Sequence, residues 1–302
     1  MSKQPDIFKT VGWLCLIGDN SRFFFNDRAV MSLPPKPPLI DPIQLQALLG
    51  SALGRFDVDA LAECASTNSL LLERAMRGAP AGSVLVADRQ TAGRGRRGRR
   101  WLSSADSSLT FSVLWRFDGG VERLVGLSLA IGIAVQRALA SCGAPGVKLK
   151  WPNDLLLGDA KLGGILVELQ SERQSMLAVI GIGLNLQLPT VDPNQADFAQ
   201  AVAALGQAIS PLPERHRLLA EILIELAAVL DRFALGGFAV LRSEWQVCNA
   251  WQNRPVRLLR DGVIEKEGIC RGADIDGALL IESSRGLERC LSGDLSLRVI
   301  EP

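Results

Sequence analysis

The sequence predicts an α+β fold, in which a mixed β-sheet packs against helices, followed by a small all-β unit. Strand-like runs of apolar residues at 83–88 and 109–117 come before a long, almost wholly apolar helix at 123–141, a mixture typical of a sheet with packed helices. From Arg254 onward, by contrast, short strands are separated by turns such as Asp261-Gly262. Since 48% of its 302 residues are apolar, the chain can bury a large core.

The individual elements follow from apolar periodicity and from capping signals. Pro42 is tolerated in the first turn of a helix, and Ser66 is a suitable N-cap for the next one. The turn at 158–160 predicts a hairpin between two apolar strands. Helices are predicted at 41–53, 66–76, 123–141, 197–208, 213–234 and 237–249, and strands at 56–63, 83–88, 109–117, 147–151, 154–157, 164–170 and 177–186.

The domain organisation follows from changes in composition. Residues 1–40 contain a proline cluster at 34–38 and no amphipathic period, so we expect an extension outside the fold. A catalytic domain is expected over 41–252 and a small β-barrel over 253–302. The longest apolar run, near 124–135, is interrupted by glycine and serine and is too short to cross a bilayer.

Composition restricts the chemistry. A net charge of +1 gives the whole chain no general attraction for polyanions. The six cysteines are scattered without a C-x-x-C pair, which is typical of reduced thiols in a cytoplasmic protein, and no metal site is indicated. With one histidine and no tyrosine, the usual general bases are scarce. We therefore expect chemistry driven by positioning and electrostatics, as in phosphoryl or nucleotidyl transfer.

The segment GRGRRGRRW at 93–101 is the most informative part of the chain. Its glycines let the backbone approach a ligand, and its arginines present planar, charged forks that match phosphate oxygens. A G-x-G-x-x-G pattern is present, but a strand rather than a helix follows it, which argues against a dinucleotide-binding fold. A solvated basic loop or a nucleic-acid patch stays an alternative from this segment alone.

A second group of motifs lies in the predicted sheet: KWPND at 150–154, KLGGI at 161–165 and GIGLN at 181–185. Glycine inside a strand often marks a place where something approaches the backbone closely. Three motifs of this kind in one sheet, two of them with glycines inside a strand, indicate a flat ligand lying on it. The alternative for each motif is that its glycines ease packing and its lysines edge the strands.

Together these motifs resemble those of the biotin protein ligase family. The resemblance is carried by Ser66-Thr67-Asn68, Gln90, the 93–101 segment and the three strand motifs, in the family's order and spacing, and it runs from about residue 60 to the end. It implies a class II synthetase-like catalytic domain with a C-terminal SH3-like barrel. It also implies a cytoplasmic enzyme that forms biotinoyl-5'-AMP from biotin and ATP, with Mg²⁺ on the triphosphate. Biotin then passes to one lysine of a biotin carboxyl carrier protein. No nucleic acid or membrane is expected as a partner, and homodimerisation is left open.

The resemblance assigns roles to residues. It implies catalysis by Arg96, Lys161 and Asp154, with Asp154 orienting or deprotonating the acceptor lysine. Expected biotin-binding residues are Ser66, Thr67, Asn68, Gln90, Gly93, Arg94, Gly95, Arg96, Lys161, Gly164, Ile165, Gly181 and Gly183. Expected ATP- or adenylate-binding residues are Arg94, Arg96, Arg99, Trp101, Asn153, Lys161, Asn185 and Arg271. The polar set at 66–68 and Gln90 supplies the donors and acceptors that a buried urea demands.

The chain also departs from the family pattern. Nothing before residue 41 resembles the winged helix-turn-helix of the regulatory members, so no DNA binding is implied. The family's adenine-stacking tryptophan near 190–200 has no clear match, and Phe198 is the candidate replacement. Two alternative functions remain at this point. A lipoate–protein ligase uses the same chemistry on an acid that lacks a urea, and a nucleic-acid-binding protein would use the arginine-rich segment without catalysis.

Overall fold

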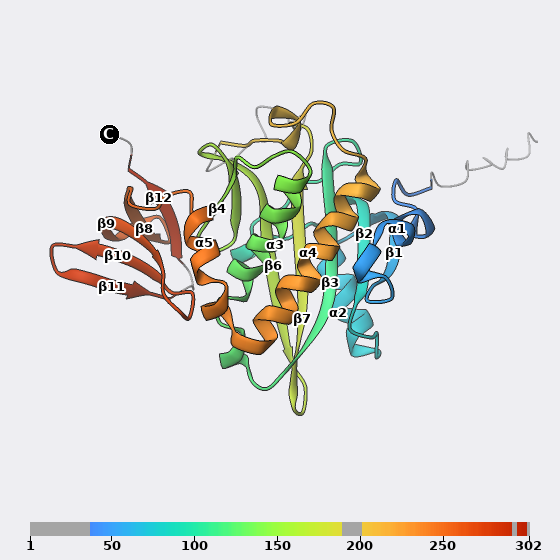
Figure 1. Ribbon diagram of the computed structural model, residues 1–302, viewed down its shortest axis with the longest axis horizontal. Coiled ribbons are helices and arrows are strands. Elements are labelled where there is room, and N and C mark those ends of the chain that lie inside the picture. Colours follow the sequence, from blue (N-terminus) through green and yellow to red (C-terminus); the bar gives the residue numbers. More distant parts are fainter. Residues whose placement is uncertain (1–36, 189–200, 292–294, 301–302) are drawn as a thin grey trace, which may run out of the picture. The chain divides into compact units, whose positions relative to one another are not determined.

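The computed structural model describes residues 37–188, 201–291 and 295–300, and Figure 1 shows their arrangement. A seven-stranded sheet has the order β1-β2-β3-β7-β6-β5-β4. Only the β1–β2 pair in it is parallel, so the predicted mixed sheet is confirmed. Its strands are β1 (Asp57–Cys64), β2 (Ser83–Gln90), β3 (Ser108–Asp118), β4 (Val147–Lys150), β5 (Asp154–Leu157), β6 (Ala160–Ser171) and β7 (Ser175–Asn185).

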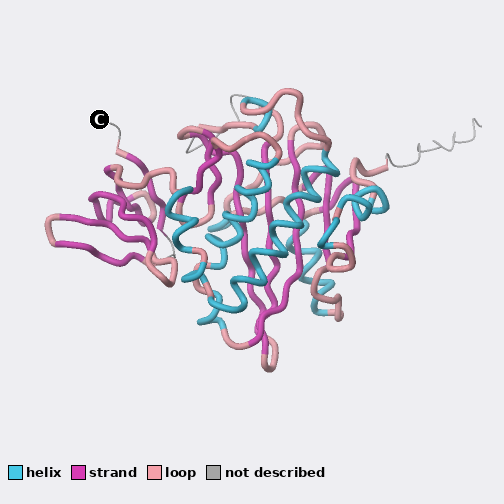
Figure 2. Tube along the Cα trace, viewed as in Figure 1, coloured by secondary structure: helices cyan, strands magenta, loops and turns pink. Residues whose placement is uncertain are grey.

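Helices cover the two faces of this sheet unequally. They are α1 (Pro42–Leu48), α2 (Thr67–Met76), α3 (Leu127–Ser141), α4 (Arg215–Gly236) and α5 (Arg242–Cys248). Figure 2 shows the long helices α3 and α4 crossing in front of the strands. On that face Val84 and Val86 of β2 join the main core, whereas Leu85 between them joins a small cluster with Leu71 of α2 on the other face. This alternation is the period of two that a strand imposes on its side chains.

The second face is covered only in part, and this is where the site lies. The small cluster around α2 consists of Leu71, Leu85, Leu114, Leu177 and Val179. Farther along the same strands, on the same side-chain period, stand Thr110 and Ser112 of β3 and Gly181 and Gly183 of β7. The face that α2 leaves uncovered is therefore built from hydroxyls and glycines rather than from branched apolar side chains.

Four predicted helices differ from the structure. The helix expected at 41–53 is α1 followed by a 3-10 turn at Gly50–Ala52, and Gly50 has a positive φ of 48°. The helix expected from residue 123 begins at Leu127, because a 3-10 turn at Val121–Leu124 ends at Val125 and Gly126, with a φ of 80°, is the N-cap of α3. The helix expected at 237–249 is a 3-10 turn at Phe238–Val240 followed by α5, and Gly237, with a φ of 61°, separates this turn from the end of α4. Of the helix expected at 197–208, the described part is not α-helical. Instead, backbone bonds join the main chain of Lys161 to residues Ala201 and Ala203, and only Leu205–Gln207 forms a 3-10 turn.

The region after Arg254 is a five-stranded antiparallel sheet, with the order β11-β10-β9-β8-β12. It consists of β8 (Pro255–Arg260), β9 (Val263–Ala273), β10 (Leu279–Ser283), β11 (Gly286–Cys290) and β12 (Leu295–Val299), so the predicted short strands are confirmed. Both sheets belong to one compact unit, Lys36–Pro302. The indole of Trp151, for example, donates from Nε1 to the carbonyl of Gly277 at 3.1 Å.

The expected start of the fold needs correction. The boundary expected at residue 40 falls too late, because Ile40 is 1% exposed within the main core and the amide of Leu39 donates to the carboxylate of Asp88.

The stretch Val121–Ser141 is long and apolar enough, by length and composition, to cross a membrane. Most of it is buried inside the protein, however, and burial against the sheet and α4 accounts for its apolar character.

Candidate active site

A cavity of about 600 Å³ opens on the partly covered face of the seven-stranded sheet. Residues from α2, the 93–101 segment, the β4–β5 turn, the start of β6, the C-terminal end of β7 and most of β12 line it. Among the described lining residues one side chain is a carboxylate, that of Asp154. Eight are cationic: Arg94, Arg96, Arg97, Arg99, Arg100, Lys150, Lys161 and Arg298. The cavity thus concentrates the positive charge of a chain whose net charge is only +1.

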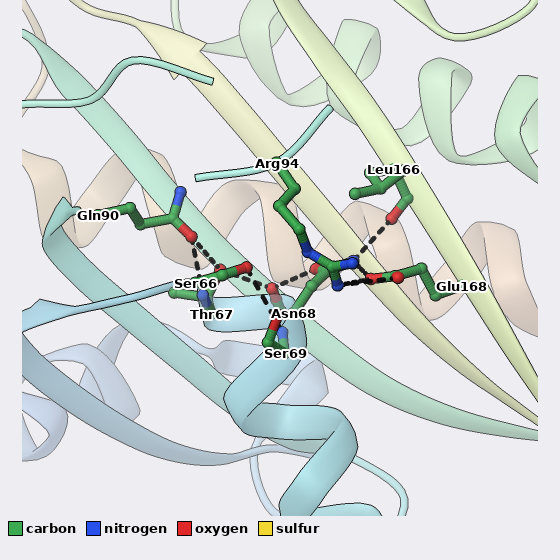
Figure 3. Close-up of polar contacts among 9 residues, drawn as sticks. Ser66, Thr67, Asn68, Ser69, Gln90, Arg94, Leu166 and Glu168 are labelled. Atoms are coloured by element: carbon green, nitrogen blue, oxygen red, sulfur yellow. Dashed lines mark hydrogen bonds and ion pairs between the residues drawn. The ribbon is translucent and has the colours of Figure 1, made fainter. Parts of the chain in front are cut away.

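One end of the cavity is a cluster of uncharged polar groups at the N-terminus of α2 (Figure 3). Ser66 is the N-cap of this helix, and its hydroxyl accepts from the Ser69 amide. Gln90 comes from the end of β2, and its Oε1 accepts from the Thr67 amide at 2.7 Å. Ser66, Thr67 and Asn68 are all buried, at 4% exposure or less. The helix terminus therefore positions the three predicted residues side by side.

Asn68 is the most constrained member of this cluster. Its Oδ1 accepts from the hydroxyl of Ser112 at 2.6 Å, and its Nδ2 donates to Glu168 at 2.9 Å. The amide rests on the backbone of Gly181, where an added Cβ would lie 2.2 Å from Oδ1. Glycine at 181 is required by Asn68 itself. Gly181 also lines the cavity.

The 93–101 segment folds back on itself as a small hairpin, called the arginine loop below. The backbones of Arg94 and Arg100 form an antiparallel bridge, and Trp101 donates from its amide to the carbonyl of Gly93 at 2.9 Å. At the tip Arg97 and Gly98 both have positive φ, 62° and 69°. Thus the glycine at 98 has the conformational role expected for it.

Two arginines and a tryptophan join the arginine loop to the sheet. Arg94 pairs with Glu168 of β6 at 2.8 Å, and Arg96 donates to Oδ1 of Asn153 at 3.2 Å. The ring of Trp101 lies on Gly183 of β7, where an added Cβ would be 2.5 Å from the indole. Gly183, like Gly181, makes room for a protein side chain. The Nε1 of Trp101 is buried and makes no hydrogen bond within the described part of the chain.

A buried charge cluster lies below the arginine loop. The two carboxylate oxygens of Asp154 each accept from a lysine: Oδ1 from Lys161 at 2.6 Å and Oδ2 from Lys150 at 2.8 Å. Burial alone would raise the pKa of Asp154, but the ammonium groups of Lys161 and Lys150 outweigh it and hold that pKa well below its usual range. Asp154 is therefore a firmly ionised carboxylate with both oxygens occupied.

The two lysines differ in their surroundings. The Lys150 side chain is 3% exposed and its ammonium lies 5.2 Å from the centre of the Trp251 ring. Burial lowers the pKa of Lys150 to about 8, against the opposing effect of Asp154. The Lys161 side chain is 30% exposed, so this lysine is the one that remains accessible from the cavity.

Two asparagines hold the backbone around these charges. Asn153 donates from Nδ2 to the carbonyl of Ile165 at 2.8 Å, which connects the β4–β5 turn to β6. Asn185 is 9% exposed and donates to the carbonyl of Ala203 at 3.0 Å. It thereby fixes the segment that pairs with the Lys161 backbone. Both side chains line the cavity, as expected for residues near the nucleotide.

Most of the residues singled out from the sequence come together at this cavity, and two do not. Gly93 and Arg271 are absent from its described lining. A Cβ on Gly93 would meet the backbone oxygen of Trp101 at 2.5 Å, so this glycine serves the closure of the arginine loop. The guanidinium of Arg271 is held by Glu282 and Asn253 within the C-terminal region.

The C-terminal sheet contributes a different arginine. Residues Leu295, Ser296, Leu297 and Arg298 of β12 line the cavity. Burial and the nearby Arg99 lower the pKa of Arg298, which Asp154 partly offsets. Sequence reasoning missed Lys150, Glu168, Ser112 and Arg298 as site residues. Lys150 alone carried a signal, as the first letter of the KWPND motif.

The segment in which an adenine-stacking aromatic was expected, including Phe198, lies outside the described residues. The biotin/lipoate A/B protein ligase family model matches residues 61–185, which span every motif of the first sheet.

The chain is similar in sequence and in structure to proteins that are already known. The chain is 39% identical over 279 residues to the bifunctional ligase/repressor BirA of Escherichia coli, covering 90% of this chain and 84% of that protein. It is 36% identical over 254 residues to the biotin–[acetyl-CoA-carboxylase] ligase of Mycobacterium tuberculosis, with coverage of 82% and 91%. The biotin protein ligase of Aquifex aeolicus, solved in complex with biotin and ATP, superposes with a TM-score of 0.69 at 29% identity, over 81% of this chain and 99% of that one. By these similarities the chain belongs to the biotin protein ligases of the biotin/lipoate A/B protein ligase family.

Proposed function

We propose that this protein is a biotin–[biotin carboxyl carrier protein] ligase, which activates biotin with ATP and transfers it to a lysine of the carrier protein. The observation that carries the proposal is the division of the cavity into two parts. One end holds uncharged donors and acceptors on α2, and the other end holds a strong excess of cationic side chains. A ligand with a urea at one end and a carboxylate at the other, followed by a nucleotide triphosphate, matches both parts.

The polar cluster is the proposed site for the ureido ring. A buried urea must have its N–H and C=O groups satisfied, and Ser66, Thr67, Asn68 and Gln90 provide side chains of both kinds. Gly164, Ile165, Gly181 and Gly183 belong to β6 and β7 beneath the cavity. The apolar tail of biotin would lie along these strands, with its carboxylate directed toward the arginine loop and Lys161.

The nucleotide is proposed to lie at the cationic end. Arg94, Arg96 and Arg99 of the loop, with Trp101, Asn153, Lys161 and Asn185, surround this part of the cavity. Lys161 and Lys150 share the single carboxylate of Asp154, so this cluster keeps a net positive charge, and Lys161 together with Arg96 of the loop is proposed to contact the phosphates. In place of Arg271, we assign the contribution of the C-terminal sheet to Arg298.

Magnesium is proposed to enter with the triphosphate as part of the nucleotide substrate. Within residues 37–188, 201–291 and 295–300 there is no group of three His, Cys, Asp or Glu side chains able to hold a metal ion. The cavity carboxylate, Asp154, has both oxygens engaged by lysines. The chemistry of this donor set does not fit a protein-held cation, so the phosphates themselves would supply the ligands.

In the first step the biotin carboxylate attacks the α-phosphorus of ATP. A bond forms between the carboxylate oxygen and phosphorus, and the bond to the leaving pyrophosphate breaks. Because two anions must meet, cationic groups at the α-phosphate lower the barrier most effectively. Lys161 is suited to this task, since its ammonium is fixed by Asp154 and remains accessible from the cavity.

In the second step the neutral amine of the carrier lysine attacks the acyl carbon of biotinoyl-5'-AMP. An amide forms, AMP leaves and the amine nitrogen loses a proton. Asp154 was a candidate to accept that proton, but a carboxylate whose pKa is held so low is a weak base. We therefore assign Asp154 to positioning Lys161 and Lys150, and not to deprotonating the acceptor.

The decisive experiment measures pyrophosphate release from ATP with biotin, with lipoate and without an acid. We expect release with biotin only, followed by biotin transfer to an added carrier protein. Release with lipoate alone would identify a lipoate–protein ligase. Absence of release with either acid, together with nucleic-acid binding, would favour the non-enzymatic alternative in which the arginine loop contacts a polynucleotide.

A further inference from the structure

Glu168, in β6, joins two parts of the site that are distant in the sequence (Figure 3). Its Oε2 accepts from Nδ2 of Asn68 at 2.9 Å, and both of its oxygens lie 2.8 Å from a guanidinium nitrogen of Arg94. Glu168 belongs to no motif recognised in the sequence, and it is not among the described residues that line the cavity. It stands behind two residues that do line it.

The bond to Asn68 determines how that amide is oriented. Asn68 could present its oxygen or its nitrogen to β6 in the same space. Glu168 and the carbonyl of Leu166 are both acceptors, so the nitrogen must face them, and the oxygen must face the hydroxyl of Ser112. Since Nδ2 is used in this way, the acceptor Oδ1 is the polar atom of Asn68 best placed to serve an N–H donor. A ureido ring has such donors and a dithiolane does not.

The bond to Arg94 is one of the contacts that hold the arginine loop on the sheet. Arg94 is at the base of the hairpin, where its backbone bridges to Arg100. The side chains of the pair are 44% and 26% exposed, so water and salt weaken the interaction. An ion pair of this kind can break and form again as the loop opens and closes.

We propose that Glu168 is a positioning residue that couples the orientation of Asn68 to closure of the arginine loop. This inference rests on the proposed biotin site. A ligand that holds Asn68 in place also holds its partner Glu168 toward Arg94, and so favours the closed loop. Coupling free energies are reciprocal, so the closed loop retains the ligand in return.

The test uses E168Q, which preserves the size of the side chain and a carbonyl acceptor for Asn68 but removes the charge that Arg94 pairs with. The five arginines of the loop are natural trypsin sites. In the wild type we expect biotin to slow tryptic cleavage within 93–101. In E168Q we expect that protection to fall at least fivefold, biotin to dissociate about five to twenty times faster, and the KM for biotin to rise with little change in kcat.

The matched control is E172Q. Glu172 directly follows β6 and pairs with Arg116 at 2.8 Å, also at a partly exposed surface. Its loss removes the same kind of ion pair from the same region without touching the cavity, and we expect wild-type protection and dissociation. Thermal melts of both variants establish that each is folded.

R94M tests the coupling from the other side, with a change at a more exposed residue. Because R94M and E168Q remove the same bond, the double variant should lose no more protection than R94M alone. Wild-type protection in E168Q, an equal loss in E172Q, or additive losses in the double variant would each overturn the coupling. A wild type that binds no biotin at all would instead refute the proposed function on which it rests.

Discussion

The indole ring of Trp101 lies on Gly183, at the point where the arginine loop meets β7. A Cβ built on Gly183 would lie 2.5 Å from two carbons of the ring, Cε2 and Cζ2. The arginine loop therefore rests on a strand that has no side chain at the contact. The lack of a side chain at Gly183 therefore helps to position the loop, together with the contacts of Arg94 and Arg96.

G183A should displace Trp101 and with it the loop. Overpacking of this kind costs about 1–3 kcal/mol, so we expect the KM for biotin to rise about tenfold or more. Steady-state kinetics provide the measurement. G146A is the control, because an added Cβ there meets no atom within 4 Å. If G183A binds biotin as the wild type does, the Trp101 contact does not hold the loop.

K161A should suppress adenylate formation much more than it weakens biotin binding. Loss of a fixed charge aimed at the transition state reduces rates by about 10²–10³, whereas Lys161 lies away from the ureido cluster. Pyrophosphate release gives the rate, and calorimetry with biotin alone gives the affinity. K148A, which changes a partly exposed lysine of β4 outside the cavity lining, should leave both unchanged. A large loss of affinity with an unchanged rate would contradict the assignment.

R96G should leave adenylation active but let biotinoyl-5'-AMP escape. Arg96 joins the loop to Asn153, and one charge-assisted hydrogen bond contributes about 1.5–3 kcal/mol, or about ten- to a hundredfold in retention of the intermediate. Labelling of lysines on a bystander protein detects the escaped acyl-adenylate. R89A removes a surface arginine paired with Glu63 and serves as the control. Equal bystander labelling by R96G and the wild type would exclude the retaining role.

Adenylation should slow as the pH rises through about 8. Burial lowers the pKa of Lys150 to about 8, so above that pH the lysine is neutral and Asp154 keeps only Lys161 as a cationic partner. Asp154 then neutralises a larger share of the positive charge of Lys161, so less of that charge acts on the substrate. K150M lacks the charge at every pH, so its rate should be low at pH 7 and converge with the wild-type rate above pH 8. Parallel profiles for the two proteins would contradict this account.

A chain beginning at Met31 should keep full stability, and one beginning at Asp41 should not. The shorter chain lacks Ile40, which is 1% exposed in the core, and the Leu39 amide that donates to Asp88. Loss of one large buried aliphatic side chain costs about 2–5 kcal/mol. Thermal melts of the two chains give the comparison. Equal melting temperatures would show that residues before 41 do not stabilise the fold.

The sequence was sufficient to predict which segments form the strands and which two kinds of residue, uncharged polar and cationic, make up the site. Strands such as β3 and β7 alternate or run apolar over their whole length, and Ser66 caps α2 as its residue type predicts. These features are local, because they depend on neighbours within a few residues. The helix predicted at 197–208 was wrong for the opposite reason, because the described part of that segment pairs with the distant backbone of Lys161. The helix predicted at 237–249 was confirmed only over α5, after a 3-10 turn.

By itself, the sequence determined that a glycine- and arginine-rich segment, a polar helix start and two lysine-bearing strand motifs occur in one chain. Only the tertiary structure decided their partners. It placed Asn68 on Gly181 and Trp101 on Gly183, joined Lys150 and Lys161 through Asp154, and brought Arg298 rather than Arg271 to the cavity. Glu168 acquired its two partners, 74 and 100 residues away, in the same way. Contacts of this length depend on sheet register and on which face a side chain occupies, and no local pattern of residues specifies either one.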